Sequence, residues 1–253
     1  MRTLNLVGSA LFAAMFLGGC ASLGPKLDSP RMAKVKKVVV LSFEIQQQHP
    51  ADNLGVGALK GERAADSPEL KAMAKDTYSL LTLELSRTLG KSVIGYESLK
   101  SQSSYKGIYH DKMEGVSRKT FMGNSKYEVV FADGILDDAN GRMLSHEQKV
   151  QLAKSVGADA YATFVIIHAI QQSSYSLGHI FGGGDFSYVA RSNLQVYDFS
   201  SPEPIWRIQN VDGEESPKAS SLGEIAKLEK ISRLGKESSM TSLKNLSSRY
   251  SKN

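Results

Sequence analysis

The sequence predicts an α+β fold in which a mixed sheet, with a C-terminal antiparallel three-strand meander, packs against two to three helices. Three apolar stretches in a row predict the meander, over residues 160–170, 186–199 and 204–211. In the second stretch, apolar and polar side chains alternate, which indicates an antiparallel sheet with one solvent-exposed face. Its apolar face carries Phe186, Tyr188, Ala190, Leu194 and Val196, and its polar face carries Ser187, Arg191, Asn193 and Gln195.

The first predicted elements of the fold are a strand and a long helix. The β-branched apolar run over residues 35–43 predicts a buried central strand. Residues 46–66 are polar and contain glycine, so we expect a long loop there. Residues 67–69, Ser-Pro-Glu, favour a helix start with a cap, a proline in the first turn and an acid near the positive end of the dipole. Helical apolar spacing continues toward Gly90, a typical stop.

The middle of the chain predicts shorter elements. Residues 92–94 and 127–132 are apolar enough for two short strands. Between them, residues 96–126 are rich in Ser, Lys, Gly and Tyr without clear periodicity, so we expect an irregular insertion. Residues 145–148, Ser-x-x-Gln, form a capping box, and the helix that it opens is predicted to run to Val156.

The C-terminal stretch predicts an amphipathic helix. Residues 222–250 carry apolar side chains mostly every third residue, with Lys and Glu between them, and we expect an interruption near Gly235. Packing against the sheet is favoured over lying on a membrane or binding a partner, because an apolar stripe most often faces a core.

The first residues predict export and lipidation. Arg2 precedes an apolar run over residues 6–17 and then small residues, the layout of a secretory signal peptide. This run is shorter than the roughly 20 residues that a membrane-spanning helix needs. It ends in Leu17, Gly18, Gly19 and Cys20, which resemble the lipobox of bacterial lipoproteins. The resemblance implies cleavage before Cys20 and a diacylglycerol on its thiol.

Cys20 is the only cysteine in the chain, so no internal disulfide can form. The alternative to lipidation is an ordinary cleaved signal followed by a stray cysteine, but a free reactive thiol would be a liability on an exported protein. Apart from the covalent lipid on Cys20, we expect no cofactor. By resemblance to enterobacterial sorting, Ala21 and Ser22 imply the outer membrane, facing the periplasm, rather than the inner membrane.

The predicted organisation is a signal peptide over residues 1–19, a lipidated tether over residues 20–34 and a single domain over residues 35–253. The tether is expected to be extended because it is polar and broken by Pro25 and Pro30. Loss of Arg2 with the signal peptide leaves 30 of the 31 Lys and Arg residues against 26 Asp and Glu. This mildly basic balance does not predict a nucleic-acid partner.

The predicted order of strand, helix, strand, helix, meander and helix resembles the periplasmic α/β domain of three groups. They are the curli-assembly lipoproteins, the lipoprotein activators of penicillin-binding proteins and the amino-terminal domain of the Tol translocation protein. Residues 152–160, a predicted helix end with Gly-Ala-Asp before a strand, are typical of these domains. The similarity covers residues 35–250. It implies a non-enzymatic binding, scaffold or assembly factor in secretion or cell-wall processes, with an envelope protein as partner.

Two features depart from these groups. Residues 100–126 lack the apolar alternation that a lipid-facing hairpin of a curli-type channel needs. The predicted tether is also much shorter than the long disordered tether of the penicillin-binding-protein activators. A subunit of a curli-type secretion channel therefore stays an alternative.

No catalytic or metal-binding pattern is recognisable in the sequence. The five histidines lie in unrelated segments, and His168 in its apolar strand is expected to be a buried sheet residue. Residues 136–147 approach a calcium-loop pattern, but Leu136 occupies the position of the first carboxylate, so a turn is favoured. We therefore assign no catalytic and no metal residues, and an envelope enzyme whose site is assembled from distant residues stays an alternative.

The loop over residues 171–185 is unusually apolar for a connection between two strands. Its large side chains either fold back on the sheet edge or form a patch for a partner, on a stem of three glycines. The candidate patch residues are Tyr175, Leu177, Ile180 and Phe181.

Overall fold

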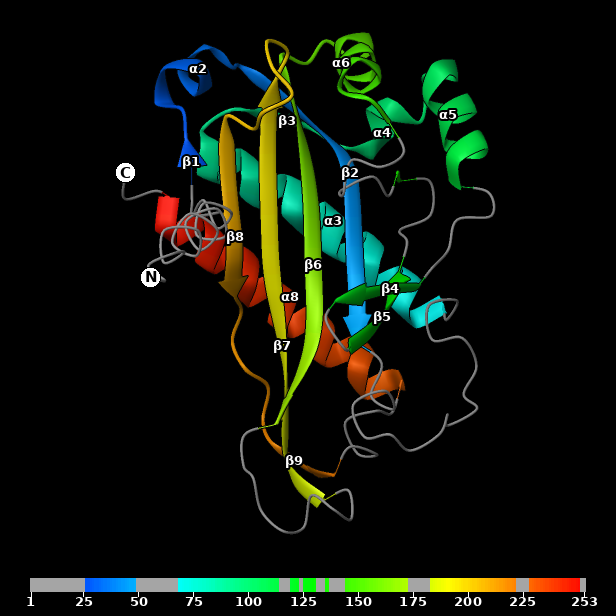
Figure 1. The fold of residues 1–253 in the computed structure, drawn as a ribbon, viewed down its shortest axis with the longest axis vertical. Helices are drawn as coiled ribbons and strands as arrows, with labels where there is room; N and C mark the ends of the chain where they lie inside the picture. Colours follow the sequence, from blue (N-terminus) through cyan, green and yellow to red (C-terminus); the bar gives the residue numbers. More distant parts are fainter. Residues whose placement is uncertain are drawn as a thin grey trace, which may run out of the picture.

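A computed structural model describes residues 26–48, 68–113, 119–122, 125–130, 135–136, 144–172, 183–221 and 228–250. These residues form a nine-stranded mixed sheet with helices packed on both faces (Figure 1). The predicted fold class is confirmed, including the antiparallel meander and the helices packed against it.

The sheet is built around a parallel pair of strands. β2 (Lys37–Gln48) lies beside β6 (Ala160–Gln172) and runs in the same direction. β7 (Gly183–Asp198) runs antiparallel to β6, and β8 (Trp206–Asp212) runs antiparallel to β7. These three strands are the predicted meander. Its last strand, β8, lies near one edge of the sheet.

Shorter strands extend the sheet on both sides. β1 (Lys26–Leu27) pairs with the start of β8 and forms the edge there. β3 (Ser92–Ile94) runs parallel to the first half of β2, and β5 (Ser125–Val130) runs antiparallel to its second half. β4 (Lys119–Met122) lies beyond β5, and β9 (Ala219–Ser221) pairs with the start of β7.

Two long helices cover one face of the sheet. Figure 1 shows α3 (Pro68–Leu89) and α8 (Leu228–Tyr250) crossing behind the strands on the same diagonal. The other face is covered near one end by α4 (Tyr96–Leu99), α5 (Ser103–Met113) and α6 (His146–Ser155). The sheet therefore separates two apolar cores, a large one under α3 and α8 and a smaller one under α4 to α6.

The alternation predicted for β7 places its apolar residues in the large core. The buried members are Phe186, Tyr188, Ala190, Leu194 and Val196. On the other face, Arg191, Asn193 and Gln195 are half-buried, whereas Ser187 is fully buried and donates a hydrogen bond to Glu215. An antiparallel sheet with one more polar face is thus confirmed for this strand.

The predicted helix boundaries are set by local chemistry that the structure reproduces. α3 begins at Pro68 and stops before Gly90, whose φ of +58° is a left-handed conformation that favours glycine. At α6, the Ser145 side chain accepts from the backbone N–H of Gln148, and the Gln148 side chain accepts from the N–H of Ser145. Gly157, with φ +70°, follows that helix.

The prediction of an irregular insertion over residues 96–126 is wrong. This region contains α4, α5, β4 and the start of β5. Leu99 and Tyr105 hold the two helices by burying their side chains in the smaller core. Helices this short carry too few apolar residues to show a period in the sequence, so tertiary packing decides their structure.

The prediction of an extended tether up to Lys34 is wrong for its second half. β1 and α2 (Ser29–Lys34) lie on the domain, and Met32 joins the large core. Pro30 lies in the first turn of α2, where its missing N–H costs nothing, and Asp28 caps the helix. Pro30 thus lies at the start of a helix instead of extending the chain, and Pro25 lies outside the described residues.

The prediction of a helix break near Gly235 is also wrong, because α8 continues through this residue. A Cβ atom at Gly235 would lie 2.9 Å from the Sδ atom of Met73 and 3.0 Å from Cε1 of His168. The glycine therefore allows α8 to approach both α3 and β6 closely. One glycine in a helix costs about 1 kcal/mol relative to alanine, which close packing offsets.

The prediction of a long loop over residues 46–66 is wrong for residues 46–48, which belong to β2, and residues 49–66 lie outside the described residues. These three glutamines are buried. The amide oxygen of Gln48 accepts from the backbone N–H of Ile170 at 2.8 Å, which satisfies part of its hydrogen-bonding capacity inside the sheet. Polar composition alone therefore misplaces the end of this strand.

Candidate functional site

The lipobox and the candidate partner patch lie outside the described residues. These are Leu17, Gly18, Gly19 and Cys20 of the lipobox, and Tyr175, Leu177, Ile180 and Phe181 of the loop patch. Asp138, Asn140 and Gly141 of the calcium-loop pattern lie outside them as well. The described residue nearest to Cys20 along the chain is Lys26, where the amino-terminal segment joins the fold.

The amino-terminal segment is held by an ion pair between α2 and the end of β7. Arg31 donates from Nε to Oδ2 of Asp198 at 2.9 Å, and its Nη2 donates to the other carboxylate oxygen. Nη2 also donates to the hydroxyl of Ser200 at 2.8 Å. The hydrogen bonds from Arg31 lower the pKa of Asp198 to about 2. The side chains are 27% and 16% exposed, so water screens this pair only in part.

Local sequence explains why Arg31 points at Asp198. Asp28 accepts a hydrogen bond from the backbone N–H of Arg31 at 3.1 Å, which caps α2. The backbone N–H of Asp28 donates to the carbonyl of Ile205 at 2.7 Å, which ties the start of the helix to the strand that follows the turn. These two hydrogen bonds fix the start of α2 independently of the ion pair.

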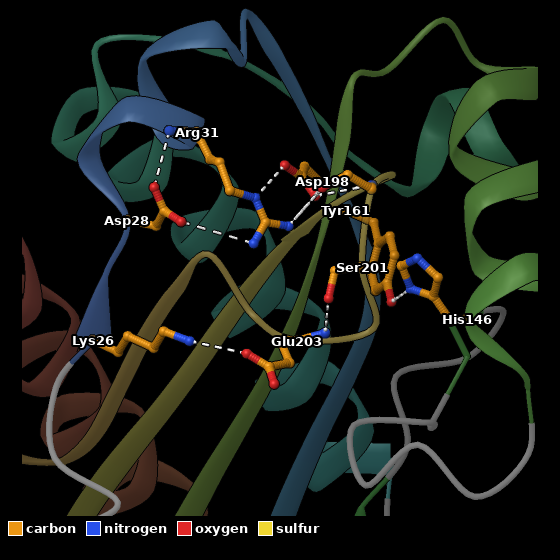
Figure 2. A network of polar contacts seen from close by, with 9 residues as sticks. Lys26, Asp28, Arg31, His146, Tyr161, Asp198, Ser201 and Glu203 are labelled. Atoms are coloured by element: carbon orange, nitrogen blue, oxygen red, sulfur yellow. Dashed lines mark hydrogen bonds and ion pairs between the residues drawn. The ribbon is translucent and has the colours of Figure 1, made fainter.

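The turn after β7 is the other half of the contact. Asp198 accepts from the backbone N–H of Ser200 at 3.0 Å, and the Ser201 hydroxyl accepts from the N–H of Glu203 at 3.1 Å. Glu203 then accepts from Nζ of Lys26 at 3.2 Å. Figure 2 shows Lys26 and Arg31 both reaching toward this turn. We call the set Lys26, Asp28, Arg31, Asp198, Ser200 and Glu203 the amino-terminal clasp.

A second polar cluster lies inside the large core. His168 is fully buried, its Nδ1 lies 3.1 Å from Oε1 of Gln47, and its Nε2 lies 2.7 Å from Oγ of Ser239. Tyr188 donates to the same Gln47 oxygen. Burial lowers the pKa of His168 to about 3 and raises that of Tyr188. A neutral, enclosed imidazole has no access to a substrate, so His168 is the buried sheet residue that the sequence predicts.

An acidic cleft lies between α8 and the segment that follows β8. Its volume is about 310 Å³. Three of its side chains are exposed carboxylates, so it attracts cations and repels anions. The lining residues are Glu214, Glu215, Ser216, Pro217, Leu234, Glu237, Ser238 and Thr241.

An aromatic contact joins α6 to the sheet on the side of the smaller core. The rings of Tyr161 and Tyr197 stack with centroids 4.9 Å apart, and Nδ1 of His146 lies 2.9 Å from the Tyr161 hydroxyl. Figure 2 shows the His146 ring against Tyr161. Because Tyr161 is 2% exposed, we interpret the contact as helix packing.

Within the described part of the chain, no three His, Cys, Asp or Glu side chains gather as metal ligands. No helix of these residues has both the length and the hydropathy for crossing a bilayer. Among the described residues, the polar clusters considered are thus the amino-terminal clasp, the cluster around His168 and the acidic cleft.

Sequence reasoning missed the clasp, although part of it was visible. Asp28 followed by Ser29 and Pro30 is a helix start, with a cap and a proline in the first turn. Pro25 and Pro30 were both interpreted as breaks in the chain, so the helix start at Asp28 was not predicted. The partner of Arg31 is 167 residues away, so the ion pair itself has no local signature.

The comparisons with known proteins give only distant structural similarity. No protein-family model matches the chain, and no curated protein matches it. Among solved structures, the chain is similar to the hypothetical protein CT253 from Chlamydia trachomatis. The sequence identity is 8% and the TM-score 0.35, over 86% of this chain and 99% of that one. This similarity does not establish a shared fold.

Proposed function

We propose that the protein is an outer-membrane lipoprotein, anchored by lipid on Cys20, whose periplasmic domain is a non-enzymatic binding or assembly factor. The lipobox supports the anchor, and two or three acyl chains make such an attachment stable where one does not. The predicted partner is another envelope protein in secretion or cell-wall processes, in line with the resemblance to curli-assembly and penicillin-binding-protein activator lipoproteins.

The observation that carries this proposal is the amino-terminal clasp. Six residues after Cys20, the chain is paired with β8 and then fixed to the end of β7 by Arg31. A free linker would be expected to remain polar and unpaired. A short linker clasped to a rigid sheet instead holds the domain close to its anchor, which suits a protein that presents one surface to other envelope components.

The proposed partner surface is the loop patch of Tyr175, Leu177, Ile180 and Phe181. Clustered large apolar side chains on a loop are typical of contact surfaces, and hot spots are enriched in aromatic residues. The loop joins β6 to β7, so a partner bound there would be held by the first two strands of the meander.

The binding proposal is tested by crosslinking the intact lipidated protein in native membranes and purifying it with its partner. Phe181→Asp is expected to reduce partner recovery at least fivefold and to leave the melting temperature nearly unchanged, because the proposed patch does not contribute to the core. Leu83→Asp on α3, at a leucine that is 47% exposed, is the matched control and should capture the partner normally. A large loss of stability in Phe181→Asp with capture intact would show that Phe181 packs on the sheet.

A further inference from the structure

We infer that one edge of the domain faces the bilayer that holds Cys20. This edge consists of β1, the outer side of β8 and the C-terminal turns of α8, and we call it the anchor edge. The inference rests on the proposed lipid anchor and adds an orientation to it.

The linker between Cys20 and Lys26 limits how far the domain can lie from its lipid anchor. Lys26 pairs with Arg207 and Leu27 with Trp206, so the chain is fixed to β8 from residue 26 onward. Six residue steps separate Cys20 from Lys26, and a fully extended chain spans about 3.5 Å per step. Lys26 therefore lies at most about 20 Å from the lipidated cysteine, whatever path the linker takes.

The end of α8 reaches the same edge of the sheet. Along α8, Lys236 contacts Asp76 on α3, Ser238 accepts from the backbone N–H of Ala190 on β7, and Ser242 donates to the carbonyl of Val211 on β8. Asn245 then donates to the carbonyl of Asp212 at 2.9 Å. The helix thus crosses from α3 over β7 to β8, and its last turns lie at the edge where β1 lies. Figure 1 shows the red end of α8 near β1.

The sheet is wider than the linker is long. The strand order from β1 to β4 contains six spacings, and at about 4.8 Å each they measure about 30 Å. α5 lies past the centre of the sheet, since its Tyr105 accepts from the backbone N–H of Leu136, which in turn bonds to Phe43 on β2. The linker limits how far the anchor edge can lie from the membrane, whereas it sets no such limit for the α5 side.

A side chain on the anchor edge is also suited to the bilayer surface. Leu27 on β1 is 45% exposed and follows Lys26 directly, whose side chain is 45% exposed. Among the described residues, Leu27 and Leu83 are the exposed large apolar side chains. The carbon atoms of Leu27 can lie at the membrane–water interface, while the ammonium group of Lys26 points to the polar side of that interface.

The test uses two matched variants of the full lipidated protein, Lys244→Cys on α8 and Lys106→Cys on α5. Both lysines are exposed. Because lipid occupies the only native thiol, a fluorophore can be attached to the introduced cysteine alone. Each protein is purified in detergent, reconstituted in phosphatidylcholine vesicles that contain acceptor-labelled lipid headgroups, and analysed for energy transfer. We expect at least twofold more transfer from position 244 than from position 106.

A second pair of proteins carries about ten flexible Gly and Ser residues before Lys26, which lengthen the linker without touching the fold. In this background the difference between the two positions should shrink toward none. Equal transfer in the original vesicle-bound proteins, or a difference that survives the longer linker, would overturn the orientation. A protein that carries no lipid and does not float with vesicles would overturn the anchor as well, so the two failures are distinguishable.

Discussion

Gln47 and His168 are direct neighbours across the parallel pair of β2 and β6, and Oε1 of Gln47 lies 3.1 Å from Nδ1 of His168. An amide oxygen can only accept, so the proton of the neutral imidazole is on Nδ1 and Nε2 accepts from Ser239 on α8. The ring therefore joins the two central strands to α8. Such a network is stabilising only while every member keeps its partner.

The first prediction concerns pH. The folded pKa of His168 is about 3 and its ordinary value is 6.5, so between these values the unfolded chain binds a proton that the folded protein does not. Stability is fully present above about pH 6.5 and is lost as the pH falls toward 3, with a slope of about 1.4 kcal/mol per pH unit. Urea unfolding at pH 7, 6, 5.5 and 5 measures this slope of the unfolding free energy.

His168→Gln is the matched control for this slope, because glutamine keeps hydrogen-bonding groups but does not titrate. The variant is expected to be less stable at pH 7 and to lose most of the slope between pH 6 and 5, where few carboxylates titrate. If wild type and variant show the same slope, the imidazole is not buried in its neutral form.

The second prediction concerns the close approach of α8. Gly235→Ala would place a Cβ atom 2.9 Å from Met73 and 3.0 Å from His168, whose ring is held by two hydrogen bonds. We expect a loss of about 1–3 kcal/mol, which exceeds the gain of about 1 kcal/mol in helix propensity. Denaturant unfolding measures the change.

Gly107→Ala in α5 is the matched control, since nothing lies within 4 Å of its added Cβ atom. This variant should be stabilised by up to about 1 kcal/mol through helix propensity alone. Equal effects of the two substitutions would contradict the tight contact at Gly235.

The third prediction concerns the clasp. Arg31→Ala should destabilise the protein by about 1 kcal/mol, a loss of about 2–4 °C in melting temperature for a domain of this size. Asp198→Asn should cost a similar amount, and the double variant should cost less than the sum because the two residues share one interaction. Additive losses in this double-mutant cycle would mean that the pair does not form.

The same pair has its own pH window. Because the pKa of Asp198 is lowered to about 2 from 3.8, its stabilising effect is present above about pH 4 and is lost as the pH falls toward 2. In Arg31→Ala this part of the acid-unfolding curve should flatten, whereas Arg31→Lys should keep part of it.

Elements with strong local chemistry were predictable from the sequence. The start of α3 at Pro68 and its stop at Gly90, the Ser145 capping box of α6 and the alternation in β7 all correspond to observed elements. Each of these patterns acts within a few residues of the chain, so its physical cause is visible in sequence.

Elements that depend on distant contacts were not predictable. α4 and α5 are short and are stabilised by burying Leu99 and Tyr105 under residues far along the chain. Gly235 suggests a helix break unless Met73 and His168 are known to lie against it. The Arg31–Asp198 pair is likewise invisible because long-range partners have no spacing rule, and two prolines outweighed the capping pattern of α2.

The most direct test of the account is metabolic labelling with palmitate, followed by membrane fractionation of the wild-type protein and of Cys20→Ser. Cys20 is the only cysteine, so its loss removes the attachment site without affecting any disulfide. The account predicts that the wild type incorporates label and sediments with membranes, and that Cys20→Ser incorporates none and is recovered in the soluble fraction. Label in Cys20→Ser, or an unlabelled wild type, would contradict the lipid anchor.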